Sequence, residues 1–155
     1  MTYQLLKLIH LLSLFVWIGG MIFSHYSLRK PLMALPAAQR FPFAHHVLKR
    51  FFTAVSVSAV LVLLTGLWMI GRTAKQLSRN SVTFEMPWSW TLMAMLGIIM
   101  IIIFVYIRAV LFRRQGRAVK TSDWTAAGGA LAVIRQWVAV NLWLGIVATI
   151  VVMLF

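Results

Sequence analysis

The sequence predicts an all-α integral membrane protein, a bundle of four transmembrane helices that forms one domain over residues 1–155. Its composition is 62% hydrophobic and 11% charged, whereas soluble domains average about 45–50% apolar and about 25% charged residues. A chain of this length cannot hide the excess in a core, because a small protein has a large surface to cover. Lipid as the outer solvent removes that requirement.

Four apolar segments are each long enough to cross the membrane, since about 20 helical residues span about 30 Å of hydrocarbon. We place these segments at about residues 4–27, 51–71, 90–112 and 133–154. The first is too long for the core of a signal peptide, and no small-residue cleavage pattern follows it. The small residues at 126–130 are expected to let the chain turn into the fourth helix.

The basic residues predict the orientation, because short loops rich in Lys and Arg stay in the cytoplasm. The first and third connections, with the helix ends beside them, contain Arg29, Lys30, Arg40, Lys49, Arg50, Arg108, Arg113, Arg114, Arg117, Lys120 and Arg135. The second connection and the N-terminal end contain only Lys7, Arg72, Lys75 and Arg79. We therefore expect loops one and three in the cytoplasm, and loop two and both termini outside.

Charge and residue usage exclude several function classes. The net charge of +13 comes from Lys and Arg residues that lie between the apolar segments. This placement indicates anionic lipid headgroups rather than nucleic acid as the partner. The chain has no cysteine, so disulfides and thiolate metal sites are excluded. The two acids, Glu85 and Asp123, are expected on opposite sides of the membrane, so no hydrolytic carboxylate pair or Ser-His-Asp set can form. Electron transfer through a bound cofactor is the chemistry that remains.

The first helix sorts its functional side chains onto one face. At 100° per residue, about a third of the circumference holds Lys7, His10, Ser13, Trp17, Met21, Ser24 and His25. The opposite side is Leu, Ile, Phe and Val. Ionisable groups in membranes normally face the interior of a bundle, so we expect this face to be turned away from lipid.

His10 is the first candidate ligand. A neutral imidazole inside the bundle is a candidate ligand for haem iron or copper, and the thioether of Met21 favours Cu(I) or iron. The alternative is a neutral histidine that is hydrogen-bonded between helices. On the fourth helix Trp137, Asn141, Gly145 and Thr149 share a stripe typical of helix packing, and Asn141 is the member that could face a ligand.

His25, His45 and His46 form a second candidate group. They are expected near the cytoplasmic face, where they could meet and bind a metal or remain ordinary interfacial residues. Fifteen residues of helix, about 22 Å, separate His10 from His25, so the two cannot ligate one haem.

Several short motifs resemble a known family. The run from Lys7 to Phe23, KLIHLLSLFVWIGGMIF, resembles the first helix of the CopD and HemJ group of bacterial inner-membrane proteins. The second helix is similar in Lys49–Phe52 and Leu64–Trp68, and the last CopD-type helix resembles Arg135 with Asn141–Gly145. The resemblance covers most of the chain, and its most distinctive residues are His10, Trp17, Gly20 and Arg50.

The resemblance implies a multi-pass protein of the bacterial inner membrane, in which the termini predicted outside would be periplasmic. It also implies two functions. HemJ-type proteins are haem-b-containing protoporphyrinogen oxidases whose essential histidine His10 would match, and CopD proteins are linked to copper uptake or resistance. The chain departs from the HemJ pattern in having no Lys within its third helix.

The leading hypothesis from this resemblance is a haem b, or a comparable redox cofactor, held against the polar face of helix one. His10 would be the axial ligand and Trp17 would pack on the cofactor, with Met21 or Asn141 lining the site. Arg29 and Arg50 would pair with propionates or lipid phosphates. A quinone or another membrane redox partner would exchange electrons with the cofactor.

Copper handling, with His10, Met21, His25, His45 and His46 as ligands, is the alternative. A third hypothesis is a non-catalytic subunit of an oligomer or a larger membrane complex.

Overall fold

The computed structural model describes residues 2–79 and 86–154, and this part of the chain contains helices and turns but no strand. In chain order the elements are α1 (Thr2–Ile22), η1 (Phe23–Ser27), α2 (Arg29–Met33), α3 (Ala37–Arg79), α4 (Trp88–Tyr106), η2 (Ile107–Leu111), α5 (Phe112–Lys120) and α6 (Trp124–Leu154). The π-helical segments η1 and η2 each continue the helix before them.

The helical elements join into four long helical rods that can each span a bilayer. They cover Tyr3–Met33, Ala37–Arg79, Trp88–Lys120 and Trp124–Leu154, and each is long and apolar enough to cross a membrane. Helices suit this solvent because they satisfy every backbone polar group internally. Large apolar side chains lie on the outside of the rods, with Phe15 68%, Leu67 61% and Ile102 62% exposed. The chain is therefore a multi-pass membrane protein.

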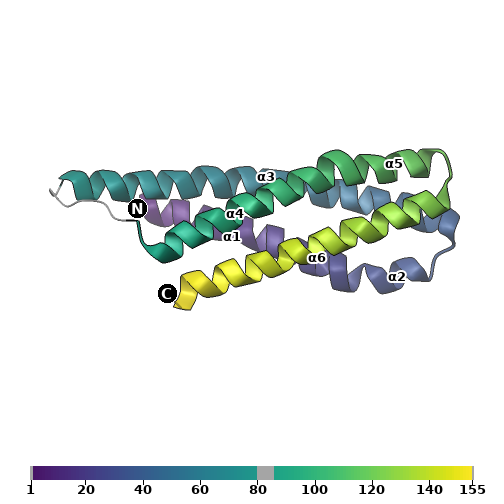
Figure 1. Cartoon of the computed structure of the whole chain (residues 1–155), viewed down its shortest axis with the longest axis horizontal. Coiled ribbons are helices and arrows are strands. Elements are labelled where there is room, and N and C mark those ends of the chain that lie inside the picture. The colour runs from purple at the N-terminus through teal and green to yellow at the C-terminus, as the bar shows by residue number, and fades with distance from the viewer. Residues whose placement is uncertain (1, 80–85, 155) are drawn as a thin grey trace.

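The helices continue beyond the predicted apolar segments. α3 has 43 residues, a length of roughly 65 Å, whereas hydropathy predicts a segment over 51–71. Its first backbone acceptor is the carbonyl of Pro36, which accepts from the N–H of Arg40 at 2.8 Å. Hydropathy predicts only the part of a helix that lies in lipid. The helix itself continues until its backbone N–H and C=O groups form hydrogen bonds outside the helix. Figure 1 shows the C-terminal end of α3 projecting past the other helices.

The turn into α6 differs from the prediction. The chain reverses at residues 121–123, where Ser122 adopts a left-handed backbone with φ 55°. The side chain of Asp123 then accepts a hydrogen bond from the N–H of Ala126 at 2.9 Å, as residues at helix N-termini commonly do. The small residues at 126–130 lie inside α6 instead. The prediction that these small residues form the turn was therefore wrong, because the turn is formed by Ser122 and by the capping side chain of Asp123.

The four rods pack as two neighbouring pairs. α1 lies along α3, while α4 and α5 lie along α6, and contacts of α1 with α6 and of α3 with α5 close the bundle. One continuous apolar core includes Trp17, Met21, Phe52, Phe104 and Ile134. Both termini lie at one end of the bundle and α2 and α5 at the other (Figure 1). Which side of the membrane each end faces remains a prediction.

Candidate functional site

The polar face of α1 is turned into the bundle. His10, Ser13, Trp17, Met21 and Ser24 are all buried, as the helical periodicity predicts. At the two ends of the face, Lys7 is exposed and His25 is half-buried. The side chains that can bind a metal or a cofactor therefore reach the interior rather than the lipid.

His10 is held by a hydroxyl from α3. Its Nδ1 lies 2.9 Å from Oγ1 of Thr65, and that hydroxyl donates its single hydrogen to the carbonyl of Leu61 at 2.5 Å. Thr65 can therefore only accept from the ring, so Nδ1 of His10 carries the proton. A neutral imidazole protonated at Nδ1 has its lone pair on Nε2. This is the arrangement in which a second residue orients a histidine for a metal.

A glycine allows this close approach of α1 and α3. A Cβ atom at Gly66 would lie 3.4 Å from Cε1 of His10, so a side chain there would crowd the ring. Thr65 is a residue that the sequence does not single out as part of a site. It does bond to its own helix, but its second contact, to His10, depends on the register between α1 and α3.

The other predicted interior residues lie deeper in the bundle. Trp17 meets Phe104 edge to face, with ring centroids 6.0 Å apart, and Met21 is 1% exposed. Asn141 is also 1% exposed, and its Oδ1 is buried with no hydrogen-bond partner in the described part of the chain. An unsatisfied buried acceptor is costly, so Asn141 has the capacity to bind a further group.

The three histidines of the other end do not gather at one point. Nδ1 of His45 donates to the amide oxygen of Gln115 at 2.5 Å, and its ring stacks on Phe112 at 4.4 Å. His46 is exposed, and His25 lies beside Tyr26. Nδ1 of His25 is buried and finds no partner among the residues that the structure describes. Residues 2–79 and 86–154 contain no group of three or more His, Asp or Glu that could hold a metal ion. The metal roles of the three stay predictions.

Gln115 was missed by sequence reasoning. It is fully buried, although it lies in a strongly basic stretch predicted as a loop. Gln115 is buried because the chain stays helical in α5 and packs against α3. This packing brings its side-chain amide to His45. The basic residues around it gave no signal of an inward-facing position.

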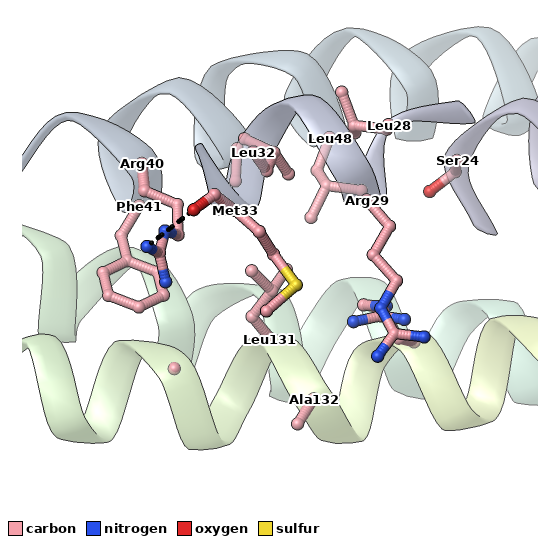
Figure 2. A pocket seen from close by; sticks show the side chains of 13 residues that line it. Ser24, Leu28, Arg29, Leu32, Met33, Arg40, Phe41, Leu48, Leu131 and Ala132 are labelled. Carbon is pink, nitrogen blue, oxygen red and sulfur yellow. Dashed lines mark hydrogen bonds between the residues drawn. The ribbon is translucent and has the colours of Figure 1, made fainter. Parts of the chain in front are cut away.

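A cavity lies at the end of the bundle opposite to the termini. Its volume is about 240 Å³, and its walls come from η1, α2, α3 and α6. Figure 2 shows Arg29 reaching across it from α2 toward α6, with Met33 between Arg29 and Leu131. Arg135 of α6 lines the same cavity. Arg50, the arginine predicted to bind a cofactor, is instead exposed and does not line it.

The His10 site and the cavity are far apart. Nineteen residues separate His10 from Arg29, roughly 28 Å of helix. Along α3, fifteen residues separate Thr65 from Arg50, roughly 22 Å. A haem on His10 would therefore reach neither arginine with its propionates, which removes the pairing that the resemblance implied.

A family model described as copper resistance protein D, CopD, matches residues 45–155. The match begins in α3 and includes α4, α5 and α6, but not α1 with His10. No curated protein and no solved structure matches the chain.

Proposed function

The chain belongs to the copper resistance protein D family, and from that membership we propose that it binds copper. We place the copper inside the helical bundle, on Nε2 of His10. The observation that supports this role is the Thr65 hydroxyl, which fixes the ring proton on Nδ1. A neutral imidazole with a free lone pair is a good ligand for copper. The ring is also already oriented before any metal arrives.

Further copper positions would lie along the same face of α1. Met21 is buried on this face, and its thioether is a soft ligand that suits Cu(I). Eleven residues separate it from His10, about 16 Å of helix, so the two cannot share one ion. They would be successive positions for copper that moves through the bundle, as a role in copper transport or resistance requires.

A copper titration tests this function. The purified chain in detergent competes with a chromophoric chelator for Cu(I), and His10→Gln is expected to weaken binding at least tenfold. Met95→Leu is the control, because Met95 is exposed on α4 and has no place in the proposed site. Equal copper binding by His10→Gln and the wild type would contradict the proposal.

Haem b is the second candidate, and the isolation of His10 favours it. The described residues offer no three-ligand metal group, but a porphyrin supplies four nitrogen ligands and needs only an axial histidine. His10 would be that ligand, with Trp17 packing on the ring, and the chain would act as a haem-dependent oxidoreductase with a quinone or another membrane redox partner.

An absorption spectrum separates the two candidates. Protein purified from haem-replete cells would show a Soret band that His10→Ala removes if haem b is bound. A colourless preparation that binds Cu(I) supports copper alone. Co-purification with a larger membrane complex, with neither metal nor haem present, would instead favour a non-catalytic subunit.

A further inference from the structure

We propose that the cavity between η1, α2, α3 and α6 binds a phosphate group, carried by an anionic phospholipid and held between the guanidinium groups of Arg29 and Arg135. This site is separate from the proposed copper position on His10, and neither proposal depends on the other.

Two positive charges face the same cavity without an acid between them. Arg29 and Arg135 both line it, and their charges repel one another. Among the residues that the structure describes, Asp123 is the sole acid, and its carboxylate caps the start of α6. Twelve residues, roughly 18 Å of helix, separate it from Arg135. An anion between the two guanidinium groups would replace their repulsion with two attractions.

The hydrogen-bonding capacity of Arg135 points to the same ligand. Its Nε is buried and has no partner within the described chain, and an unpaired buried donor is costly. Guanidinium groups bind phosphate oxygens through paired N–H donors. Arg40 also lines the cavity, but it donates to the carbonyls of Leu35 at 2.8 Å and Met33 at 3.2 Å, so it holds the end of α2 and is already occupied.

The walls of the cavity favour a lipid as the source of the phosphate. They are largely hydrocarbon, with Leu28, Leu32, Leu48 and Leu131 among the lining residues. A free phosphate ion would use only the arginines, whereas a phospholipid would also place apolar parts against these leucines.

The depth of the cavity agrees with a headgroup. Its lining residues fall at 24–33, 40–48 and 128–135. The predicted apolar segments end or begin at 27, 51 and 133, so the cavity lies where hydrocarbon gives way to headgroups. Basic pockets between helices at this level are typical sites for anionic lipids.

A lipid-binding measurement on the full chain tests the site. Delipidated protein in detergent is titrated with short-chain phosphatidylglycerol and, separately, with phosphatidylcholine and inorganic phosphate, and bound ligand is counted by native mass spectrometry. We expect phosphatidylglycerol to bind at least tenfold more tightly than the other two. Arg29→Gln and Arg135→Gln should each weaken it at least tenfold. Arg113→Gln, which alters an exposed arginine of α5, should leave it unchanged.

Two further measurements keep the test decisive. Arg135→Lys preserves the charge but not the paired donors, and we expect it to bind with intermediate affinity. His10→Gln should bind the lipid as the wild type does, which separates this site from the copper proposal. Unchanged phosphatidylglycerol binding in both Gln variants would overturn the site. Inorganic phosphate binding as tightly as the lipid, with the same dependence on the arginines, would overturn the lipid as its source.

Discussion

At the scale of single residues, one hydroxyl decides what His10 can do. Thr65 accepts from Nδ1 because its own hydrogen is committed to Leu61, and the lone pair is left on Nε2. Without that acceptor the ring would be free to exchange tautomers and to rotate. Partners that fix a ligating histidine typically change metal affinity 10–100-fold when they are removed.

Thr65→Val tests this positioning role. Valine keeps the shape of the side chain but cannot accept from Nδ1, so we expect Cu(I) affinity to fall by about 10–100-fold in the chelator competition. Thr53→Val is the matched control, because Thr53 is exposed and, within residues 2–79 and 86–154, bonds only to its own helix, to the carbonyl of Lys49. A fall of equal size in both variants would show a general effect on α3 rather than an effect on His10.

The residues of the two proposed sites differ in how far sequence could predict them. The inward position of His10, Trp17 and Met21 follows from helical periodicity alone. Thr65 and Arg135 could not be assigned in this way, because their roles depend on which residues of another helix lie opposite. The bonding of Gln115 to His45 depends on the same kind of register.

At the scale of elements, composition predicts the spans well and the helix ends poorly. All four predicted apolar segments lie within helical rods. Their ends were missed because α3 and α5 continue into basic sequence, where nothing interrupts the backbone hydrogen bonds. The actual stop at residues 121–123 is set by the left-handed Ser122 and the cap from Asp123, both local features that hydropathy does not register.

The contact between α1 and α3 depends on a close approach at Gly20. A Cβ atom there would lie 2.7 Å from the ring of Phe51, whereas one at the neighbouring Gly19 would meet nothing within 4 Å. We expect Gly20→Ala to be less stable than Gly19→Ala by about 1–3 kcal/mol, the usual cost of overpacking. Thermal unfolding of both variants in the same detergent measures the difference. Equal midpoints would show that Phe51 moves aside freely and that this contact does not limit the packing.

At the scale of the whole molecule, the structure separates the proposed metal and lipid sites. His10 belongs to the first half of α1, which starts at the end of the bundle that holds both termini, and the cavity is lined by α2 at the opposite end (Figure 1). Most of the basic residues that predict a cytoplasmic location lie at the cavity end. The proposed lipid site would then face the cytoplasmic leaflet, and His10 would lie nearer the outer face.

Single cysteines test this orientation cleanly, because the native chain has none. Ser78 and Thr121 are both exposed. Ser78 lies in the last turn of α3 and Thr121 directly follows α5, and these two helix ends lie at opposite ends of the bundle (Figure 1). In intact spheroplasts a membrane-impermeant maleimide is expected to label Ser78→Cys, and to label Thr121→Cys only after the membrane is permeabilised. The reverse pattern would place the basic loops outside and invert both site assignments.

The copper proposal requires that the interior imidazole of His10, protonated at Nδ1, binds metal through Nε2. Histidine ¹⁵N NMR of the detergent-solubilised chain observes both ring nitrogens directly, because Cu(I) is diamagnetic. The predicted result is an Nδ1 of His10 that stays protonated and an Nε2 resonance that moves when Cu(I) is added. An Nε2 that carries the proton, or an Nε2 resonance that does not shift when Cu(I) is added, would contradict metal binding through this nitrogen.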